Sequence, residues 1–119
     1  MEKVMMIFWK GPYGQINSLE GIRIAQGLLV LDVDVKIAFI EDGVFNLVKN
    51  QKPNDIGHHS IISALEAARR YDIPFYAIDF SLKIRGIKEK DIDPNLNVKI
   101  ISIDEFRDLI LQVDTTISL

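Results

Sequence analysis

Short apolar runs alternate with longer helix-like segments along this chain, and that alternation constrains its fold more than any other feature. Five runs have the length and composition of strands, at residues 4–9, 32–40, 73–78, 97–102 and 115–119. In the longer segments between them, apolar residues recur every three or four positions, as on one face of a helix, at 17–31, 58–72 and 103–113. Strands that alternate with helices need crossover connections, which make neighbouring strands parallel. We therefore predict an α/β fold in which residues 1–119 form a single three-layer domain, with helices flanking a mostly parallel sheet of about five strands.

Two shorter segments, 44–50 and 81–86, are predicted as brief helical turns. The last helix has the clearest start, because Ser102 and Glu105 have the spacing of a capping box, in which each side chain bonds a backbone N–H group. The apolar residues of this helix are expected to face the sheet, and they are Ile103, Phe106, Leu109, Ile110 and Val113.

The composition argues against several functional classes. The chain has 119 residues, 48% of them hydrophobic, which suffices for one domain with a core but not for two. Its net charge is -3, from 17 acidic and 14 basic residues, so we expect no direct nucleic-acid binding, which needs clustered cations. No apolar run approaches the roughly 18 residues of a membrane span, and no signal peptide is recognisable. We therefore expect a cytoplasmic protein without membrane contact.

Cysteine is absent from the chain, and this absence limits its chemistry. Without cysteine there is no disulfide, no cysteine-ligated zinc and no thiol nucleophile. His58 and His59 are adjacent, and neighbouring side chains on a helix point about 100° apart, which makes the two a poor pair of ligands for one metal. We expect neither a metal nor a cofactor.

The carboxyl ends of strands are where ligands and reactive groups gather in open α/β sheets. After the first strand, Gly11 and Gly14 belong to a loop that opens a helix, where backbone N–H groups could hold an anion. The loop has the spacing of neither common phosphate-binding motif, so an ordinary turn is the favoured interpretation. After the second strand, Glu41 or Asp42 could act as a general base in a hydrolase, although no acid–base partner is recognisable. A turn at Asp42-Gly43 explains the pair better, because glycine tolerates a positive φ.

After the third strand, Asp79 and Ser81 raise the question of a Ser-His-Asp triad. A triad needs a histidine beside the serine, and both histidines are predicted at the start of a different helix. We therefore predict that Asp79 or Ser81 caps the helical turn that follows, by accepting a backbone N–H.

Two longer stretches resemble a known family. IEDGVFNLVKNQKPND at 40–55, followed by a helix and then YDIPFYAIDFSLKIRGI at 71–87, is similar to the DsrE/DsrF/DsrH family, and most closely to its DsrF/TusC branch. The matching residues of the first stretch are Asp42, Gly43, Val44, Phe45, Leu47, Gln51, Lys52 and Pro53. Those of the second stretch are Tyr71, Asp72, Ile73, Ser81, Leu82, Arg85 and Gly86. We expect these motif residues to be structural or to lie at interfaces.

The resemblance implies a subunit of an oligomer, a trimer or a hexamer, that relays persulfide sulfur. The family's TusBCD and DsrEFH complexes combine three different subunits, for tRNA 2-thiouridine formation and for sulfur oxidation respectively, and a cysteine on the DsrE/TusD subunit carries the sulfur. In this chain the position of a family cysteine falls at Ile78, or next to it at Asp79. Neither side chain can hold sulfane sulfur as a thiolate does, so this chain is not expected to be the carrier.

Two hypotheses follow from the sequence. In the first, the chain is a non-catalytic subunit that supports sulfur transfer by Cys-bearing DsrE/TusD-like and DsrH/TusB-like partners, or it assembles with itself. In the second, it is a self-associating α/β protein that binds a small ligand or an anion at the first loop. Aromatic residues near the predicted strand ends could anchor interfaces in either case, and they are Trp9, Tyr13, Phe45 and Phe80.

Overall fold

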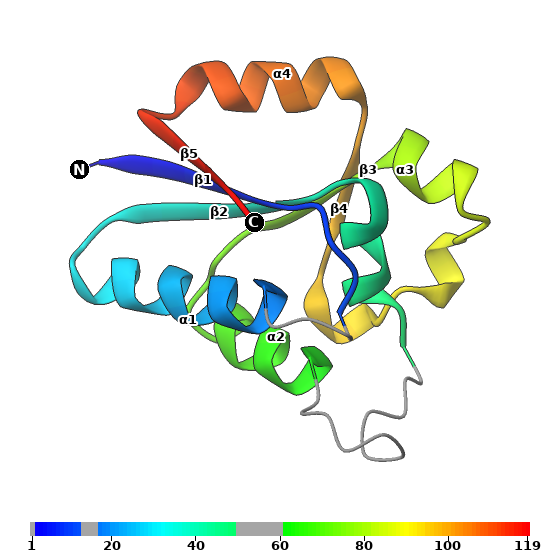
Figure 1. The fold of residues 1–119 in the computed structure, drawn as a ribbon, viewed down its shortest axis with the longest axis horizontal. Coiled ribbons are helices and arrows are strands. Elements are labelled where there is room, and N and C mark those ends of the chain that lie inside the picture. Colours follow the sequence, from blue (N-terminus) through cyan, green and yellow to red (C-terminus); the bar gives the residue numbers. More distant parts are fainter. Residues whose placement is uncertain (1, 13–16, 50–60) are drawn as a thin grey trace.

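The strands form one parallel sheet. The computed structural model describes residues 2–12, 17–49 and 61–119, whose arrangement is drawn in Figure 1. Hydrogen bonds join the strands in the order β4-β3-β2-β1-β5, and every neighbouring pair is parallel. The strands are β1 (Lys3–Phe8), β2 (Asp34–Phe39), β3 (Phe75–Ile78), β4 (Lys99–Ile101) and β5 (Thr115–Ser118). The predicted α/β fold is confirmed, and the sheet is parallel throughout.

Helices cover both faces of the sheet. The described residues form the α-helices α1 (Asn17–Val30), α2 (Ile61–Arg69), α3 (Asp79–Ile84) and α4 (Ile103–Gln112), and the short 3₁₀ helices η1 (Glu41–Leu47), η3 (Glu89–Asp91) and η4 (Pro94–Leu96). Figure 1 shows α1 and α2 on one face and α4 on the other. Helix α3 follows β3 without a loop and lies at the carboxyl ends of the strands. It therefore begins earlier than the turn predicted at 81–86.

The main core lies between the sheet and the helix pair α1 and α2. Phe8, Phe39 and Phe75 project from three adjacent strands, and their rings pack edge to face with centroids 5.3 Å and 5.7 Å apart. Ala25 of α1 and Leu65 of α2 are fully buried in the same cluster. The central strands are buried on both faces, which explains why they are apolar without strict alternation.

The opposite face of the sheet has a thinner core. Met5, Ile7 and Ala38 are its buried residues, and no residue of α4 is fully buried. Residues of α4 and its C-cap pack against this face and are partly buried, and they are Phe106, Leu109, Ile110 and the C-cap Val113. Four of the five inward residues predicted for this helix thus contact the sheet.

The start of α4 confirms one prediction and corrects another. Ser102 Oγ accepts the Glu105 N–H at 3.1 Å, and Glu105 Oε1 accepts the Ser102 N–H at 3.2 Å, as the capping-box spacing predicted. Ile103 is 56% exposed, so its predicted position against the sheet is wrong. As the first helical residue after β4, it lies at the strand ends rather than over the sheet. No helix within the described ranges combines the length and the apolarity needed to cross a membrane.

Candidate functional site

Three connections meet at the carboxyl edge of the sheet, where the backbone of η1 passes very close to the end of β1. A Cβ atom added to Gly43 would overlap the carbonyl oxygen of Phe8 and would lie 2.6 Å from its carbonyl carbon. Gly43 is therefore required because two backbones touch, and its own φ is not in the positive range. The predicted reason for this glycine, a positive φ in an Asp-Gly turn, is wrong.

Residue Glu41, and not the glycine, adopts the left-handed conformation, with φ of +50°. That conformation costs a residue with a side chain about 1 kcal/mol. Its backbone N–H donates to Ser81 Oγ at 3.0 Å, so a buried hydroxyl from α3 holds the strained position. The edge of the sheet thus fixes an unusual backbone at the end of β2.

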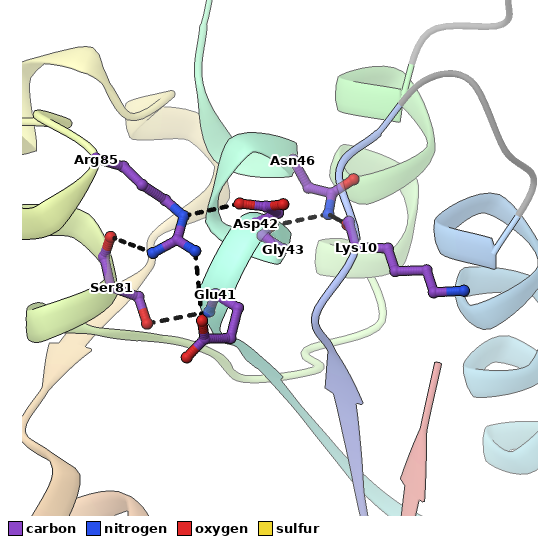
Figure 2. A network of polar contacts seen from close by, with 7 residues as sticks. All are labelled: Lys10, Glu41, Asp42, Gly43, Asn46, Ser81 and Arg85. Carbon is purple, nitrogen blue, oxygen red and sulfur yellow. Dashed lines mark hydrogen bonds and ion pairs between the residues drawn. The ribbon is translucent and has the colours of Figure 1, made fainter.

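Arg85, the residue that ends α3, joins that helix to η1. Its Nε donates to Asp42 Oδ1 at 3.0 Å, its Nη2 donates to Glu41 Oε2 at 3.4 Å, and its Nη1 donates to the carbonyl oxygen of Ser81 at 3.3 Å (Figure 2). The Arg85 side chain is only 18% exposed, whereas both carboxylates are about two-thirds exposed. The acidic pair that could have served as a general base is therefore engaged by one cation, which leaves the hydrolase hypothesis without support from this geometry.

Asn46 ties η1 to the loop after β1. Its Nδ2 donates to the carbonyl oxygen of Gly43 at 2.8 Å and to that of Lys10 at 3.0 Å, and the side chain is completely buried (Figure 2). The buried Ser18, at the start of α1, donates to the same Lys10 oxygen at 3.4 Å. Sequence reasoning missed Asn46, although one polar residue in the apolar stretch VFNLV was a usable signal.

The capping role predicted for Asp79 or Ser81 is wrong. The N-cap of α3 is Ile78, which makes no side-chain cap bond, because the helix starts directly at the end of the strand. Asp79 Oδ1 instead accepts the N–H of Phe80 at 2.6 Å, and Ser81 Oγ serves Glu41.

The two positions predicted for the family cysteine differ sharply in access to solvent. Ile78 ends β3 and is 1% exposed, whereas Asp79 opens α3 and is exposed to solvent. A reactive group at position 79 could be reached by another molecule, and one at position 78 could not without a local opening. That either position is equivalent to a family cysteine stays a prediction.

The remaining motif residues divide between packing and backbone conformation. Val44 and Leu82 are buried in the main core, and Gly86 has φ of +67°, which favours glycine. Phe45 is 37% exposed.

The first loop, predicted as a possible anion site, is described only in part. Gly11 has open space around its Cβ position. The predictions for Tyr13, Gly14, Gln51, Lys52, Pro53, His58 and His59 fall outside the described residues. Within the described ranges, no group of three or more potential metal ligands is present.

The connections at this same edge of the sheet also carry exposed apolar side chains. Trp9 follows β1 and is 44% exposed, so the predicted strand 4–9 is one residue too long at its end. Together with Phe45, the other large apolar residues that protrude here are Phe80 (56%), Ile84 (63%) and Ile103 (56%). They come from four different connections at the carboxyl edge. We name these five residues the carboxyl-edge surface.

Comparison with known proteins decides the family. The model of the DsrE/DsrF-like family matches residues 2–119. The chain belongs to the DsrE/DsrF-like family. The predicted family is confirmed, and relatives support its DsrF/TusC branch. Protein TusC of Buchnera aphidicola subsp. Baizongia pistaciae is 30% identical over 119 residues, which cover 99% of each chain. The TusC homolog of Aliivibrio fischeri is 28% identical over 114 residues, which cover 88% of this DsrE/DsrF-like chain and 97% of its own.

Solved structures support the fold. The ychN protein from E. coli superposes with a TM-score of 0.87 at 21% identity, over 100% of both chains. MTH1491 from Methanobacterium thermoautotrophicum superposes with a TM-score of 0.71 at 15% identity, again over both whole chains. At these identities, the similarity between this DsrE/DsrF-like chain and the two solved structures shows a shared fold and nothing more.

Proposed function

We propose that this chain is a non-carrier subunit of a sulfur-relay oligomer, in which persulfide sulfur is held by a cysteine on a related partner. Its membership of the DsrE/DsrF-like family and its similarity to proteins named TusC support a relay role. The observation that carries the accessory role is the complete absence of cysteine, because without a thiolate the chain cannot hold sulfane sulfur. tRNA 2-thiouridine formation and sulfur oxidation are the two pathways the family resemblance offers.

The carboxyl-edge surface is the proposed docking site for the cysteine-bearing subunit. Phe80 and Ile84 are four residues apart on α3, so they lie on one face of that helix, and both are more than half exposed. Arg85 and Ser81 fix this helix against η1, which presents the two apolar side chains at a defined position. A surface that is already ordered loses less conformational entropy on binding than a mobile one.

Co-expression with a tagged, cysteine-bearing relative of the same fold tests this proposal. We expect the two chains to co-purify, and we expect the double variant Phe80→Asp, Ile84→Asp to weaken binding by about tenfold or more, since buried apolar anchors supply much of an interface's free energy. Leu111→Asp is the matched control, because Leu111 is 77% exposed on α4, away from this edge. A chain that remains monomeric in the presence of such relatives would refute the proposal.

Sulfur loading provides an independent readout. After incubation of the complex with a cysteine desulfurase and cysteine, intact-mass spectrometry should find added sulfur on the partner and none on this chain. Sulfur that appears on this chain instead would contradict the non-carrier role. The alternative of an anion-binding protein stays a prediction, and thermal-shift screening of nucleotides and small anions would test it.

A further inference from the structure

A groove lies between α4 and the outer strand β4, on the face of the sheet opposite the main core. Helix α4 connects the two outer strands, β4 and β5, and packs over buried residues of β1 and β2. One helix does not cover a whole face of a five-stranded sheet, so a space of about 220 Å³ remains beside β4. We name the residues that line it the α4 groove, and they are Tyr76 of β3, Lys99 and Ile101 of β4, and Glu105, Asp108 and Leu109 of α4. No step of the proposed sulfur relay uses this groove.

The interior of the α4 groove is apolar and ordered. Ile101 is 2% exposed, and Tyr76 and Leu109 are partly buried against the thinner core of this sheet face. Tyr76 and Lys99 are partners in the parallel register of β3 and β4, so their side chains lie beside each other on the same face of the sheet. The strand side of the groove therefore combines a fixed aromatic ring with an ammonium group.

The helix side of the groove carries two carboxylates. Glu105 and Asp108 are three residues apart on α4, which places them on the same side of the helix. Glu105 Oε1 accepts the Ser102 N–H at 3.2 Å, which holds this side chain at the helix start and leaves its Oε2 atom without a hydrogen bond to any described residue. The Asp108 carboxylate likewise forms neither a hydrogen bond nor an ion pair within the described part of the chain.

Lys99 does not neutralise these carboxylates. Among the described residues, no ion pair joins it to Glu105, to Asp108 or to any other side chain. Opposite charges thus face one groove from its two sides without meeting. A purely anionic ligand would be repelled by the two carboxylates and a purely cationic ligand by Lys99, whereas a molecule with both charges can pair with all three groups.

We propose that the α4 groove binds a small zwitterion of the class of free α-amino acids. The ammonium group of the ligand pairs with Asp108 and with Glu105 Oε2, its carboxylate pairs with Lys99, and its side chain packs on Tyr76 and Leu109. The size of the groove favours so small a ligand, because sites for drug-sized molecules and cofactors enclose about 300–1,000 Å³. Since the charged side chains are exposed, we expect a dissociation constant of about 1 mM.

Titration of the isotope-labelled full chain, followed by NMR, tests the proposal. Glycine and leucine should each shift the backbone resonances of Tyr76, Lys99 and Asp108 until saturation, and leucine should bind more tightly because its side chain adds apolar contact. Two analogues of leucine isolate the charges, since leucinamide lacks the carboxylate and 4-methylpentanoate lacks the ammonium group. Each analogue should bind about threefold more weakly than leucine, or worse, as loss of one exposed ion pair predicts.

Two variants show which side chain recognises which charge. In Lys99→Gln, leucine should lose its advantage over leucinamide, and in Asp108→Asn it should lose most of its advantage over 4-methylpentanoate. Both positions are exposed, so these variants should keep the wild-type melting temperature. Lys90→Gln is the matched control, because Lys90 is exposed and lies outside the groove, and this variant should bind leucine like the wild type.

Several results would overturn the proposal: no binding of either amino acid, binding of a singly charged analogue as tight as that of leucine, or a wild-type preference in both groove variants. A loss of leucine binding in Lys90→Gln would do the same, because it would place the ligand elsewhere. The titration uses this chain alone, so its failure is distinct from failure of the relay proposal, which concerns binding of the cysteine-bearing relative.

Discussion

The two edges of the sheet are stabilised in different ways. At the carboxyl edge, contacts join residues far apart in the chain: Arg85 bonds Asp42 across 43 positions, and Asn46 bonds Lys10 across 36. At the amino edge, α1 ends through bonds between near neighbours, such as the Asp32 N–H and the Leu29 carbonyl. The network at the carboxyl edge depends on several segments being assembled, whereas the two helix ends at the amino edge close through their own residues. The strand starts at the amino edge are joined over long range, as between the Lys3 N–H and Asp114 Oδ2 at 2.8 Å. A substitution in the carboxyl-edge network should therefore affect several segments, whereas one at the helix ends of the amino edge should stay local.

The largest effect is expected from Gly43→Ala. The new methyl group would overlap the carbonyl oxygen of Phe8, and neither backbone can move away without shifting β1 or η1. We expect a loss of about 3 kcal/mol in the free energy of unfolding, at the upper end of overpacking effects. Urea denaturation measures this. Gly11→Ala is the control, since nothing lies within 4 Å of its Cβ position, and equal losses in the two variants would show that the contact at Gly43 does not matter.

Arg85→Met should have an intermediate effect, because it keeps the apolar stem of the side chain and removes the hydrogen bonds to η1. We expect the free energy of unfolding to fall by about 1 kcal/mol. The loss is smaller than for a fully buried ion pair, because the carboxylates of Glu41 and Asp42 are largely in solvent. Binding of the cysteine-bearing relative should weaken as well, since α3 loses its fixed position.

The matched control for Arg85 is Arg23→Met. Arg23 pairs with Glu20 at 2.8 Å within α1, but its side chain is 64% exposed and both partners lie on one helix. Such pairs contribute a few tenths of a kcal/mol. Equal losses in the free energy of unfolding for the two arginine variants would show that the long-range contacts of Arg85 stabilise the fold no more than the local pair of Arg23 does.

A gain in stability, rather than a loss, is expected from Gly27→Ala near the amino edge. Gly27 lies in the second half of α1, is exposed, and has open space at its Cβ position. Alanine should raise the free energy of unfolding by about 0.5–1 kcal/mol, because glycine is the poorer helix former. Gly21→Ala in the same helix should instead destabilise, because its Cβ would meet the Phe8 ring at 2.6 Å. Thermal unfolding of both variants would resolve this difference in sign.

The same division explains how far the sequence could be interpreted. The alternation of strands and helices along the chain and the capping box at Ser102 rest on neighbouring residues, so periodicity and spacing were enough to predict them. The roles of Gly43, Ser81 and Asn46 rest on residues that are distant in the sequence and adjacent only after folding. Gly43 and Ser81 were recognised as motif residues, yet both were given local explanations, a positive φ and a helix cap, that the structure replaces with contacts between segments.

The difference in exposure between the neighbouring residues Ile78 and Asp79 also has a practical use. Because the chain has no native thiol, Asp79→Cys would carry a single, solvent-facing attachment point for a fluorophore or a spin label, right beside the carboxyl-edge surface. Ile78→Cys, one residue earlier, would place the same chemistry inside the protein and serve as the unreactive reference. The molecule thus offers a ready-made reporter of whatever approaches that edge, and assembly could be followed in real time as a change in the label's environment.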